Sequence, residues 1–260
     1  MIDLHAHILP GVDDGPRDLD ASAALARAAV AEGTRVMAAT SHIDHSFGLA
    51  PSELAEGLVA VRRRLAADGI ALDVVAGGEI SVARLPELHD EDLDPLRLGG
   101  GPTLLVEAPL MPFAGDIEGL VFSLQVRGYR VLLAHPERSP VFQRDPQRLA
   151  GLVDQGALAQ ITAGSLIGEF GEPVRRFTIR LLQDGLVQVV ASDAHDDVRR
   201  PPGLRDAFAA AEADVPGAGL LAAWMAEEVP AAVLDGGQVP ERPELPPAPG
   251  GRLRRLIRRA

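Results

Sequence analysis

The chain has 260 residues, of which 47% are hydrophobic and 3% aromatic, so it can form one large α/β domain or two small ones around an aliphatic core. Its formal net charge of -12 argues against general binding of nucleic acid. The absence of cysteine excludes disulfides, thiolate ligands and cysteine nucleophiles. We find neither a secretory leader nor an apolar run long enough to span a membrane, and we therefore expect a cytoplasmic enzyme.

Short apolar runs alternate with helical segments along most of the chain. We predict strands at 2–7, 35–40, 73–80, 103–107, 130–135, 157–162 and 187–191, and helices at 20–32, 51–68, 116–127, 145–154 and 172–183. Continuous apolar runs separated by helices are typical of a parallel sheet covered by helices. Seven such strands favour a closed or nearly closed barrel over an open sheet.

The first apolar run carries two histidines at its end. Alternate residues of a strand point to the same face, so His5 and His7 should project together. Two neutral imidazoles directed at one point favour a metal ion. We expect Asp3, on the same run, to support the strand or the ligands rather than to bind metal.

Polar residues of ligand type also occur at the ends of five of the other six predicted strands. The carboxyl ends of the strands form the active-site mouth of an α/β barrel, so residues far apart in sequence should converge there. These residues are His42, Glu79, Glu107, His135, Asp193 and His195. One such residue alone is more often structural than catalytic, but burying the whole set without a partner would be costly. A metal centre is the better interpretation.

Several short motifs together resemble a known family. They are MIDLHAHILPGVDDG (1–15), TSH (40–42), GE (78–79), HPER (135–138), SLIG (165–168) followed by Phe170 and Gly171, and SDAH (192–195) followed by Arg200-Pro201-Pro202. This combination resembles the polymerase-and-histidinol-phosphatase (PHP) superfamily. Within it, the chain is most similar to the manganese-dependent bacterial protein-tyrosine phosphatases of capsule and exopolysaccharide loci, of the CpsB/YwqE type. The resemblance covers about residues 1–230.

The resemblance implies a fold and a ligand set. The fold is a distorted (β/α)7 barrel of the PHP type, with the active site at the carboxyl ends of its strands and three metal ions bound there. Manganese is the expected metal, with iron or zinc as alternatives. The implied ligand sets are His5, His7, Glu79 and Asp193; Glu79, Glu107 and His135, with Glu79 bridging; and Asp14, His42 and His195.

The residue types agree with phosphoryl chemistry. The ligands offer only nitrogen and oxygen, which suits manganese, iron or zinc without deciding among them. Adjacent metal ions can activate a water molecule as hydroxide and stabilise an in-line displacement at phosphorus. Arg138 and Arg200 each follow a ligand motif, and arginine binds phosphoryl oxygens in a fork geometry. We predict both as catalytic residues; a salt bridge without catalytic role is the alternative.

We divide the chain into three parts. Residues 1–238 form the metal-dependent phosphatase barrel, 239–251 form a Pro-rich linker, and 252–260 form a basic tail. The tail is either a solubilising segment or a contact for anionic membrane lipid or an acidic partner.

Three functions are compatible with these residues. The first is hydrolysis of protein phosphotyrosine, which the resemblance extends to the tail of a bacterial tyrosine kinase that controls polysaccharide synthesis. The second is a small-molecule phosphoesterase, such as a histidinol-phosphate phosphatase. The third is a non-catalytic regulatory domain that binds metal, which the intact ligand set and the two arginines disfavour. Segment 43–47 differs from the family and is expected to contact the substrate.

Overall fold

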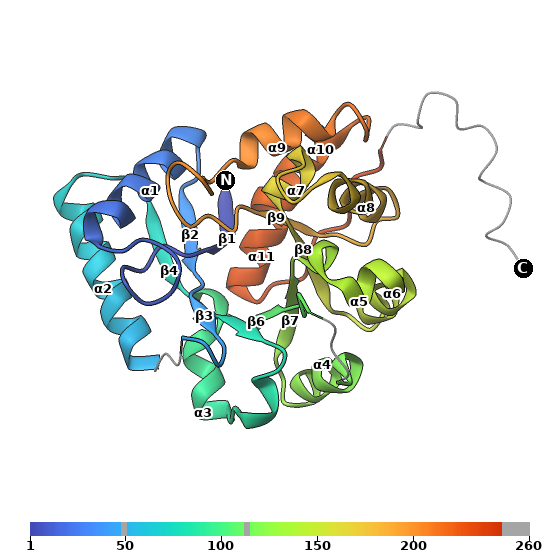
Figure 1. The fold of residues 1–260 in the computed structure, drawn as a ribbon, viewed down its shortest axis with the longest axis horizontal. Coiled ribbons are helices and arrows are strands. Elements are labelled where there is room, and N and C mark those ends of the chain that lie inside the picture. Colours follow the sequence, from blue (N-terminus) through green and yellow to red (C-terminus); the bar gives the residue numbers. More distant parts are fainter. Residues whose placement is uncertain (48–50, 112–114, 246–260) are drawn as a thin grey trace, which may run out of the picture.

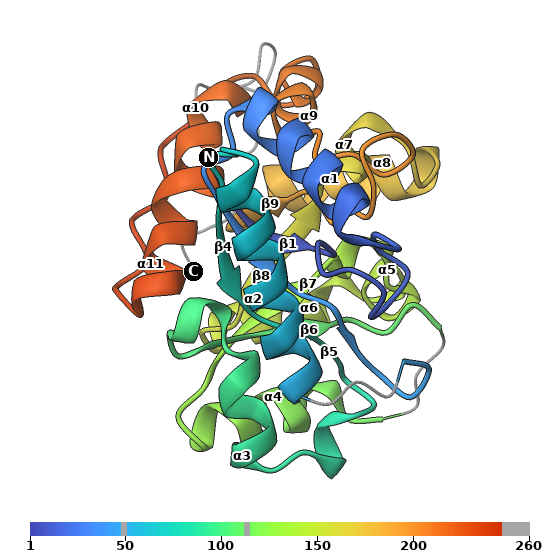
Figure 2. The ribbon, with the colours of Figure 1, turned by 90° about the vertical axis from the view of Figure 1, so that its left-hand side faces the viewer.

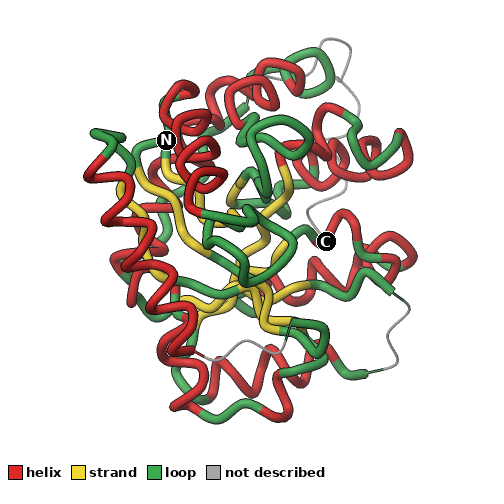
Figure 3. The backbone as a smooth tube through the Cα atoms, turned by 60° about the vertical axis from the view of Figure 1, so that its left-hand side comes forward, coloured by secondary structure: helices red, strands yellow, loops and turns green. Residues whose placement is uncertain are grey.

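The computed structural model describes residues 1–47, 51–111 and 115–245. In these ranges the strands lie at the centre of the molecule and helices surround them (Figure 1, Figure 3). All paired strands run parallel, as expected for apolar runs that are buried on both faces. The strands are β1 (Ile2–Ala6), β2 (Val36–Ala39), β3 (His42–Ile43), β4 (Asp73–Ala76), β5 (Glu79–Ser81), β6 (Thr103–Glu107), β7 (Arg130–Ala134), β8 (Leu158–Thr162) and β9 (Val189–Ala191).

The strands form a closed ring. One series pairs in the order β1, β2, β4, and a second in the order β3, β5, β6, β7, β8, β9. The chain joins the two series where β2 is followed by β3 and β4 by β5, and β9 meets β1. At that last contact the Asp193 N–H donates to the His5 carbonyl and the His7 N–H to the Ala194 carbonyl, each at 2.8 Å. The (β/α)7 barrel expected from the sequence is confirmed.

One predicted strand is broken, and the break distorts the barrel. The prediction of a continuous strand over 73–80 is wrong, because the chain leaves the first series at the end of β4 and enters the second with β5. A Cβ atom at Gly78 would lie 2.8 Å from Cδ2 of Leu96, so glycine is needed for this close approach. The break places Glu79 directly beside His42 in parallel register.

Helices cover the outside of the barrel, with α1 and α2 on one side and α5, α6 and α8 on the other (Figure 1). Figure 2 shows α2 passing along the strands. The five predicted helices are confirmed to within one or two residues. The helices are α1 (Leu19–Glu32), α2 (Pro51–Ala67), α3 (Asp90–Leu93), α4 (Ile117–Val126), α5 (Pro140–Arg144), α6 (Pro146–Asp154), α7 (Ala163–Ile167), α8 (Glu172–Gln183), α9 (Leu204–Ala211), α10 (Ala218–Ala223) and α11 (Val229–Asp235), with the π-helical turn η5 (Trp224–Glu228) before α11.

The core of the barrel is aliphatic, as the composition requires. Leu4 on β1, Leu105 on β6 and Leu132 on β7 are fully buried, and burial of each such side chain contributes about 1.5–3 kcal/mol. The polar residues at the strand ends adjoin this apolar interior. Charges there must be paired with other charges or with cations.

Residues 239–245, the first part of the predicted linker, contact the barrel. The Trp224 indole N–H donates to the Pro240 carbonyl at 3.0 Å, and the Arg242 guanidinium donates to the Leu182 carbonyl at 2.9 Å. The rest of the linker and the basic tail, 246–260, lie outside the described residues, and the boundary at 238 stays a prediction. Within the described ranges, no helix combines the length and the apolar character needed to cross a bilayer.

Candidate metal centre

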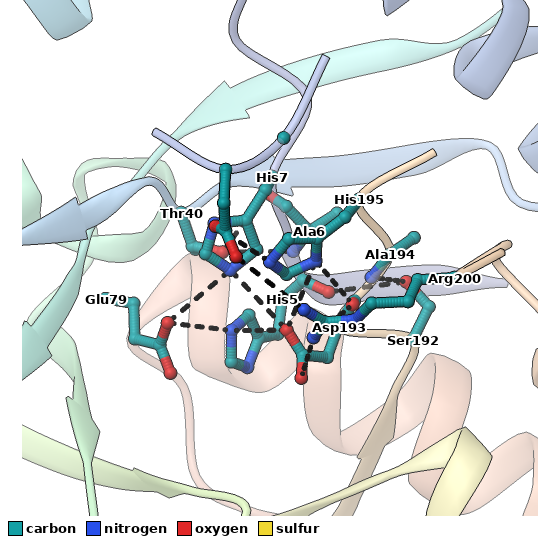
Figure 4. Close-up of polar contacts among 12 residues, drawn as sticks. His5, Ala6, His7, Thr40, Glu79, Ser192, Asp193, Ala194, His195 and Arg200 are labelled. Carbon is teal, nitrogen blue, oxygen red and sulfur yellow. Dashed lines mark hydrogen bonds and ion pairs between the residues drawn. The ribbon is translucent and has the colours of Figure 1, made fainter. Parts of the chain in front are cut away.

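The nine predicted ligands form one cluster, and five of them are labelled in Figure 4. Most lie near the end of a strand or in the loop that follows it, whereas His42 and Glu79 are the first residues of the short strands β3 and β5. His5, His7 and Asp14 come from β1 and the loop after it, His42 from β3, Glu79 from β5, Glu107 from β6, His135 from the residue after β7, and Asp193 and His195 from the loop after β9. The barrel thus brings together the side chains that the sequence singles out, and their binding of metal stays a prediction.

Two imidazoles and two carboxylates form the centre of this cluster. Nε2 of His5 and Nε2 of His7 each lie 3.4 Å from Oε2 of Glu79 and 3.5 Å from Oδ1 of Asp193. All four side chains are buried. Two ligand atoms at about 2.1 Å from one ion and at a tetrahedral angle lie about 3.4 Å apart. The imidazole–carboxylate separations therefore suit ligands of a single cation.

Glu79 also contacts two further histidines. Its Oε1 lies 2.7 Å from Nε2 of His135, and its Oε2 lies 2.9 Å from Nδ1 of His42. Ligand atoms of His5, Glu79 and His135 lie within 4.8 Å of one another, and so do those of His42, Glu79 and Glu107. In the described chain, Glu107 thus groups with His42 rather than with His135, the partner that the resemblance implies. Glu79 belongs to both groups, as a bridging ligand would.

A third group opens toward solvent. Oδ1 of Asp14 lies 3.1 Å from Nε2 of His195 and 3.4 Å from Nε2 of His42, and His7 completes a set of four within 4.8 Å. The side chain of Asp14 is 50% exposed, whereas those of His7 and His195 are buried. This side of the cluster is the one accessible from outside the barrel.

Three histidines are fixed through Nδ1, which leaves Nε2 directed at the cluster. The Nδ1 partners are Oε1 of Gln160 for His5, Oδ2 of Asp13 for His7 and the Asp193 carbonyl for His195, at 2.9, 2.8 and 2.9 Å. Their three Nε2 atoms are buried and have no hydrogen-bond partner among the described residues. Buried polar atoms without a partner are rare, and a metal-bound histidine usually donates its other N–H in this way. The residues present therefore fit a metal centre.

Asp13 and Gln160 are site residues that the sequence analysis missed. Besides holding His7, Asp13 accepts hydrogen bonds from the backbone N–H groups of His42 at 3.2 Å and Gly15 at 3.0 Å. Nothing in the sequence separates its role from that of the adjacent Asp14. Gln160 did carry a signal, because it is the one amide side chain within an otherwise apolar strand, β8.

Burial and charge shift the pKa values of the site residues. Burial lowers the pKa of His42, but the carboxylates of Asp14 and Glu79 more than offset this and raise that pKa to about 10. Burial, together with the negative charge of Glu79, raises the pKa of Glu107 to about 7. Without metal, the cluster balances its carboxylates by binding protons. Bound cations would displace protons from such groups.

Two site residues have an unusual backbone conformation. His135 and Asp193 have φ angles of 33° and 54°, and they are the only residues other than glycine with positive φ in the described chain. Such conformations cost about 1–3 kcal/mol and persist where the surrounding structure requires them. His135 follows β7 directly and Asp193 lies two residues after β9, and the tight turns allow their side chains to contact the cluster.

Both predicted arginines border the cluster and contact Asp193, with side-chain exposures of 17% for Arg138 and 33% for Arg200. Glu137 is another residue that the sequence analysis missed. It precedes Arg138 in the chain and is fully buried. Its Oε1 accepts from the Thr162 N–H at 2.9 Å. Burial raises the pKa of Glu137 to about 7.

Comparisons with known proteins identify the family of this chain. The profile of a family described as capsular polysaccharide synthesis, CpsB/CapC, matches residues 1–216. Tyrosine-protein phosphatase YwqE of Bacillus subtilis is 39% identical over 199 residues, which are 75% of this chain and 78% of YwqE. Tyrosine-protein phosphatase CpsB of Streptococcus pneumoniae is 28% identical over 216 residues, which are 80% of this chain and 88% of CpsB.

Solved structures give the same result. A structure described as YwqE from Bacillus subtilis and CpsB from Streptococcus pneumoniae, unique metal-dependent tyrosine phosphatases, matches with a TM-score of 0.82 at 34% identity and covers 95% of this chain and 99% of that chain. The lactonase Lmo2620 from Listeria monocytogenes, at 10% identity and a TM-score of 0.57 over 92% of this chain and 95% of its own, shares the fold alone. These matches confirm the resemblance seen in the motifs. The chain belongs to the CpsB/CapC family of capsular polysaccharide synthesis.

Proposed function

We propose that this protein is a metal-dependent phosphatase that hydrolyses phosphotyrosine in proteins. One observation carries the proposal: nine carboxylate and imidazole ligands and two arginines meet at one end of the barrel. Relatives that match most of the chain are named tyrosine-protein phosphatases, and the matching solved structure is described as metal-dependent. This geometry and these names support the same reaction.

The cluster has the composition of a multinuclear site. We propose three divalent ions, with manganese as the metal, which the nine candidate ligands would hold; Glu79 belongs to two of the ligand groups. When bound, such ions supply Lewis acidity at the phosphoryl group and lower the pKa of a water molecule. Asp13 and Gln160 fix the ring orientations of His7 and His5, so the ligand atoms are aligned before any ion binds.

Arg138 and Arg200 would bind the phosphoryl oxygens that the metal ions leave free. Both guanidinium groups lie beside the buried carboxylate of Asp193 and remain partly exposed. A guanidinium keeps its charge throughout the reaction and offers donors in a fixed plane. Donors fixed in advance stabilise the charge that develops in the transition state. The two arginines therefore orient the phosphate and stabilise its transfer to water.

The leaving group determines how much the reaction depends on a general acid that protonates it. The phenol of tyrosine has a pKa near 10, so its phenolate leaves more readily than an alkoxide. We infer that the physiological substrate is the tyrosine-rich tail of a bacterial tyrosine kinase in polysaccharide synthesis, and that the reaction takes place in the cytoplasm. The family description as capsular polysaccharide synthesis supports this choice. Contact of the basic tail 252–260 with anionic membrane lipid belongs to the same proposal.

The test compares three substrates on one preparation. Protein reconstituted with manganese should hydrolyse a phosphotyrosine peptide much faster than a phosphoserine peptide or histidinol phosphate. A preference for histidinol phosphate would instead identify a small-molecule phosphoesterase. Hydrolysis of none of them by the metal-loaded protein would contradict the proposal and favour a regulatory metal-binding domain.

A further inference from the structure

Phe170 lies against the guanidinium group of Arg138. The Arg138 Cζ atom is 4.2 Å from the centroid of the Phe170 ring, within the range of a cation–π contact. Phe170 is half-buried and follows helix α7 in the connection to α8. Its ring therefore borders the mouth of the site without belonging to the metal ligands.

The residues just before this connection, at the end of β8 and in α7, hold the turn from which Arg138 projects. This turn, η4 (Pro136–Arg138), contains the buried Glu137, whose Oε1 accepts hydrogen bonds from the Thr162 N–H at 2.9 Å and from Oγ of Ser165 at 2.7 Å. Segment 162–170 thus contacts the turn at two places. Glu137 fixes its backbone, and Phe170 contacts the guanidinium itself.

The position of the Phe170 ring depends on Gly164, which has no side chain. A Cβ atom at Gly164 would lie 3.3 Å from Cε2 of Phe170 and 2.2 Å from Oε2 of Glu169. The absence of a side chain at Gly164 lets the ring pack close to α7. The Phe170 ring therefore lies between the backbone at Gly164 and the guanidinium of Arg138.

Arg138 needs such support because it has few polar partners. Within the described chain, its guanidinium donates to one side chain, through Nη1 to Oδ2 of Asp193 at 2.7 Å. A single hydrogen bond leaves the guanidinium plane free to rotate about it. Stacking on a ring restricts that rotation, and a long side chain that is already ordered loses less entropy when a ligand binds.

We propose that Phe170 is a positioning residue for Arg138. The Phe170 ring holds the plane of the Arg138 guanidinium so that the remaining N–H donors of Arg138 face the phosphoryl oxygens. The inference rests on the proposed phosphatase function and names a residue that supports it. Phe170 acts through Arg138 rather than on the substrate. Its removal should then matter only while Arg138 is present.

A double-mutant cycle tests this dependence. Phe170→Leu should lower kcat/KM for an aryl phosphate on the order of fivefold, the size expected for one cation–π contact, with unchanged metal content and circular dichroism. The same substitution should have no further effect in Arg138→Ala. Phe170→Tyr, which keeps the ring, should restore most of the rate. Phe122→Leu on α4, where the ring is 60% exposed, is the matched control and should change nothing.

Binding of inorganic phosphate to the metal-loaded protein gives a readout without turnover. Phe170→Leu should weaken phosphate binding about fivefold, and Arg138→Ala should abolish that difference. Equal effects of Phe170→Leu with and without Arg138 would overturn the inference. A loss confined to aryl substrates, with alkyl phosphates and phosphate binding unchanged, would also overturn it, because Phe170 would then contact the substrate ring. If the wild type binds phosphate but hydrolyses no phosphomonoester, the proposed function fails, and the binding cycle still decides the role of Phe170.

Discussion

Arg138 and Arg200 donate to the same carboxylate oxygen, Oδ2 of Asp193, each at 2.7 Å. The other oxygen, Oδ1, is the one that faces the imidazoles of His5 and His7. Two cations on one side of the carboxylate thus fix which oxygen is available on the other side. The proposed phosphate-binding residues and the proposed metal ligands are joined through a single side chain.

The shared oxygen predicts how the arginine variants behave. In Arg138→Ala, Arg200 still holds Asp193, so metal content and fold should be retained while kcat falls on the order of 10²-fold. Arg138→Lys should recover only part of the lost kcat, because an ammonium group cannot form the bidentate contact with phosphate. Arg200→Ala should act more through KM if Arg200 binds substrate and transition state equally. Steady-state kinetics on an aryl phosphate, paired with elemental analysis, is the measurement. Wild-type turnover in Arg138→Ala would leave that residue a structural role only.

Metal content should follow the ligand set. Protein purified without chelator should contain at least two equivalents of transition metal, since each of several ligand groups could hold an ion. His135→Ala and Glu107→Ala should each lower both metal content and activity, because a vacated coordination position weakens the site. His89→Ala, at an exposed position on the surface, should retain both. Full activity after exhaustive chelation, with no bound metal, would contradict the metal centre.

Asp13→Asn tests the orientation of His7. Asp13 holds Nδ1 of His7 at 2.8 Å, and loss of such a partner typically lowers metal affinity about 10–100-fold. Asparagine keeps the size of the side chain but can present an N–H to the ring, which favours the wrong tautomer. Titration of the metal-free protein with manganese should show weaker binding, and activity should return at high metal concentration. Unchanged affinity would mean that packing alone holds the ring.

Tyr129 predicts a spectroscopic titration. It is the only tyrosine in the chain, and burial, aided by hydrogen bonds to Asp94 and Asp90, raises its pKa to about 12. Because the folded protein resists loss of this proton, tyrosine ionisation opposes folding, and stability should fall as pH rises above about 10. Absorbance near 295 nm should show little phenolate at pH 11 in the folded protein and a midpoint near 10 in denaturant. A folded-state midpoint near 10 would contradict the predicted shift.

Two truncations separate the contacts of the C-terminal segment. Ending the chain after residue 245 should leave turnover of a small aryl phosphate and the melting temperature unchanged. Ending it after 239 removes the Trp224–Pro240 and Arg242–Leu182 hydrogen bonds, each worth about 0.5–1.5 kcal/mol, and should lower the melting temperature by several degrees. Equal melting temperatures for the two truncations would show that residues 240–245 add no stability.

The sequence predicts the barrel well because its strands are continuous apolar runs bounded by helices. The candidate ligands, which the structure brings into one cluster, could be recognised for a related reason, since polar residues stand out at the ends of such runs. The break at Gly77 and Gly78 was missed because a pair of glycines is compatible with a strand when its surroundings are unknown. The packed position of Leu96, which only the structure shows, is what leaves no room for a side chain at Gly78.

Other features depend on contacts that no local pattern encodes. Asp13 cannot be separated from Asp14 without knowing which carboxylate meets His7. Glu137 lies in the HPER segment (135–138), whose charged residues are typical of an exposed turn. In the structure Glu137 is fully buried against the end of β8. No element is predicted for the Ala-rich segment after residue 200, where the structure has α9, α10 and α11, because small residues mark neither a clear face nor a clear end.

The contact between β1 and β9 has a consequence for biogenesis. His5, His7 and Asp193 carry ligand atoms, and their backbone groups make the hydrogen bonds that close the ring. Of the described strands, the first in the chain therefore pairs with the last, which is synthesised later, and an ion bound between them would act as a reversible cross-link across nearly the whole barrel. In a cell short of the metal, newly made chains should linger with β1 unpaired on one edge, the form most exposed to proteases and to pairing with other chains. Metal supply would then set the amount of this protein as well as its activity.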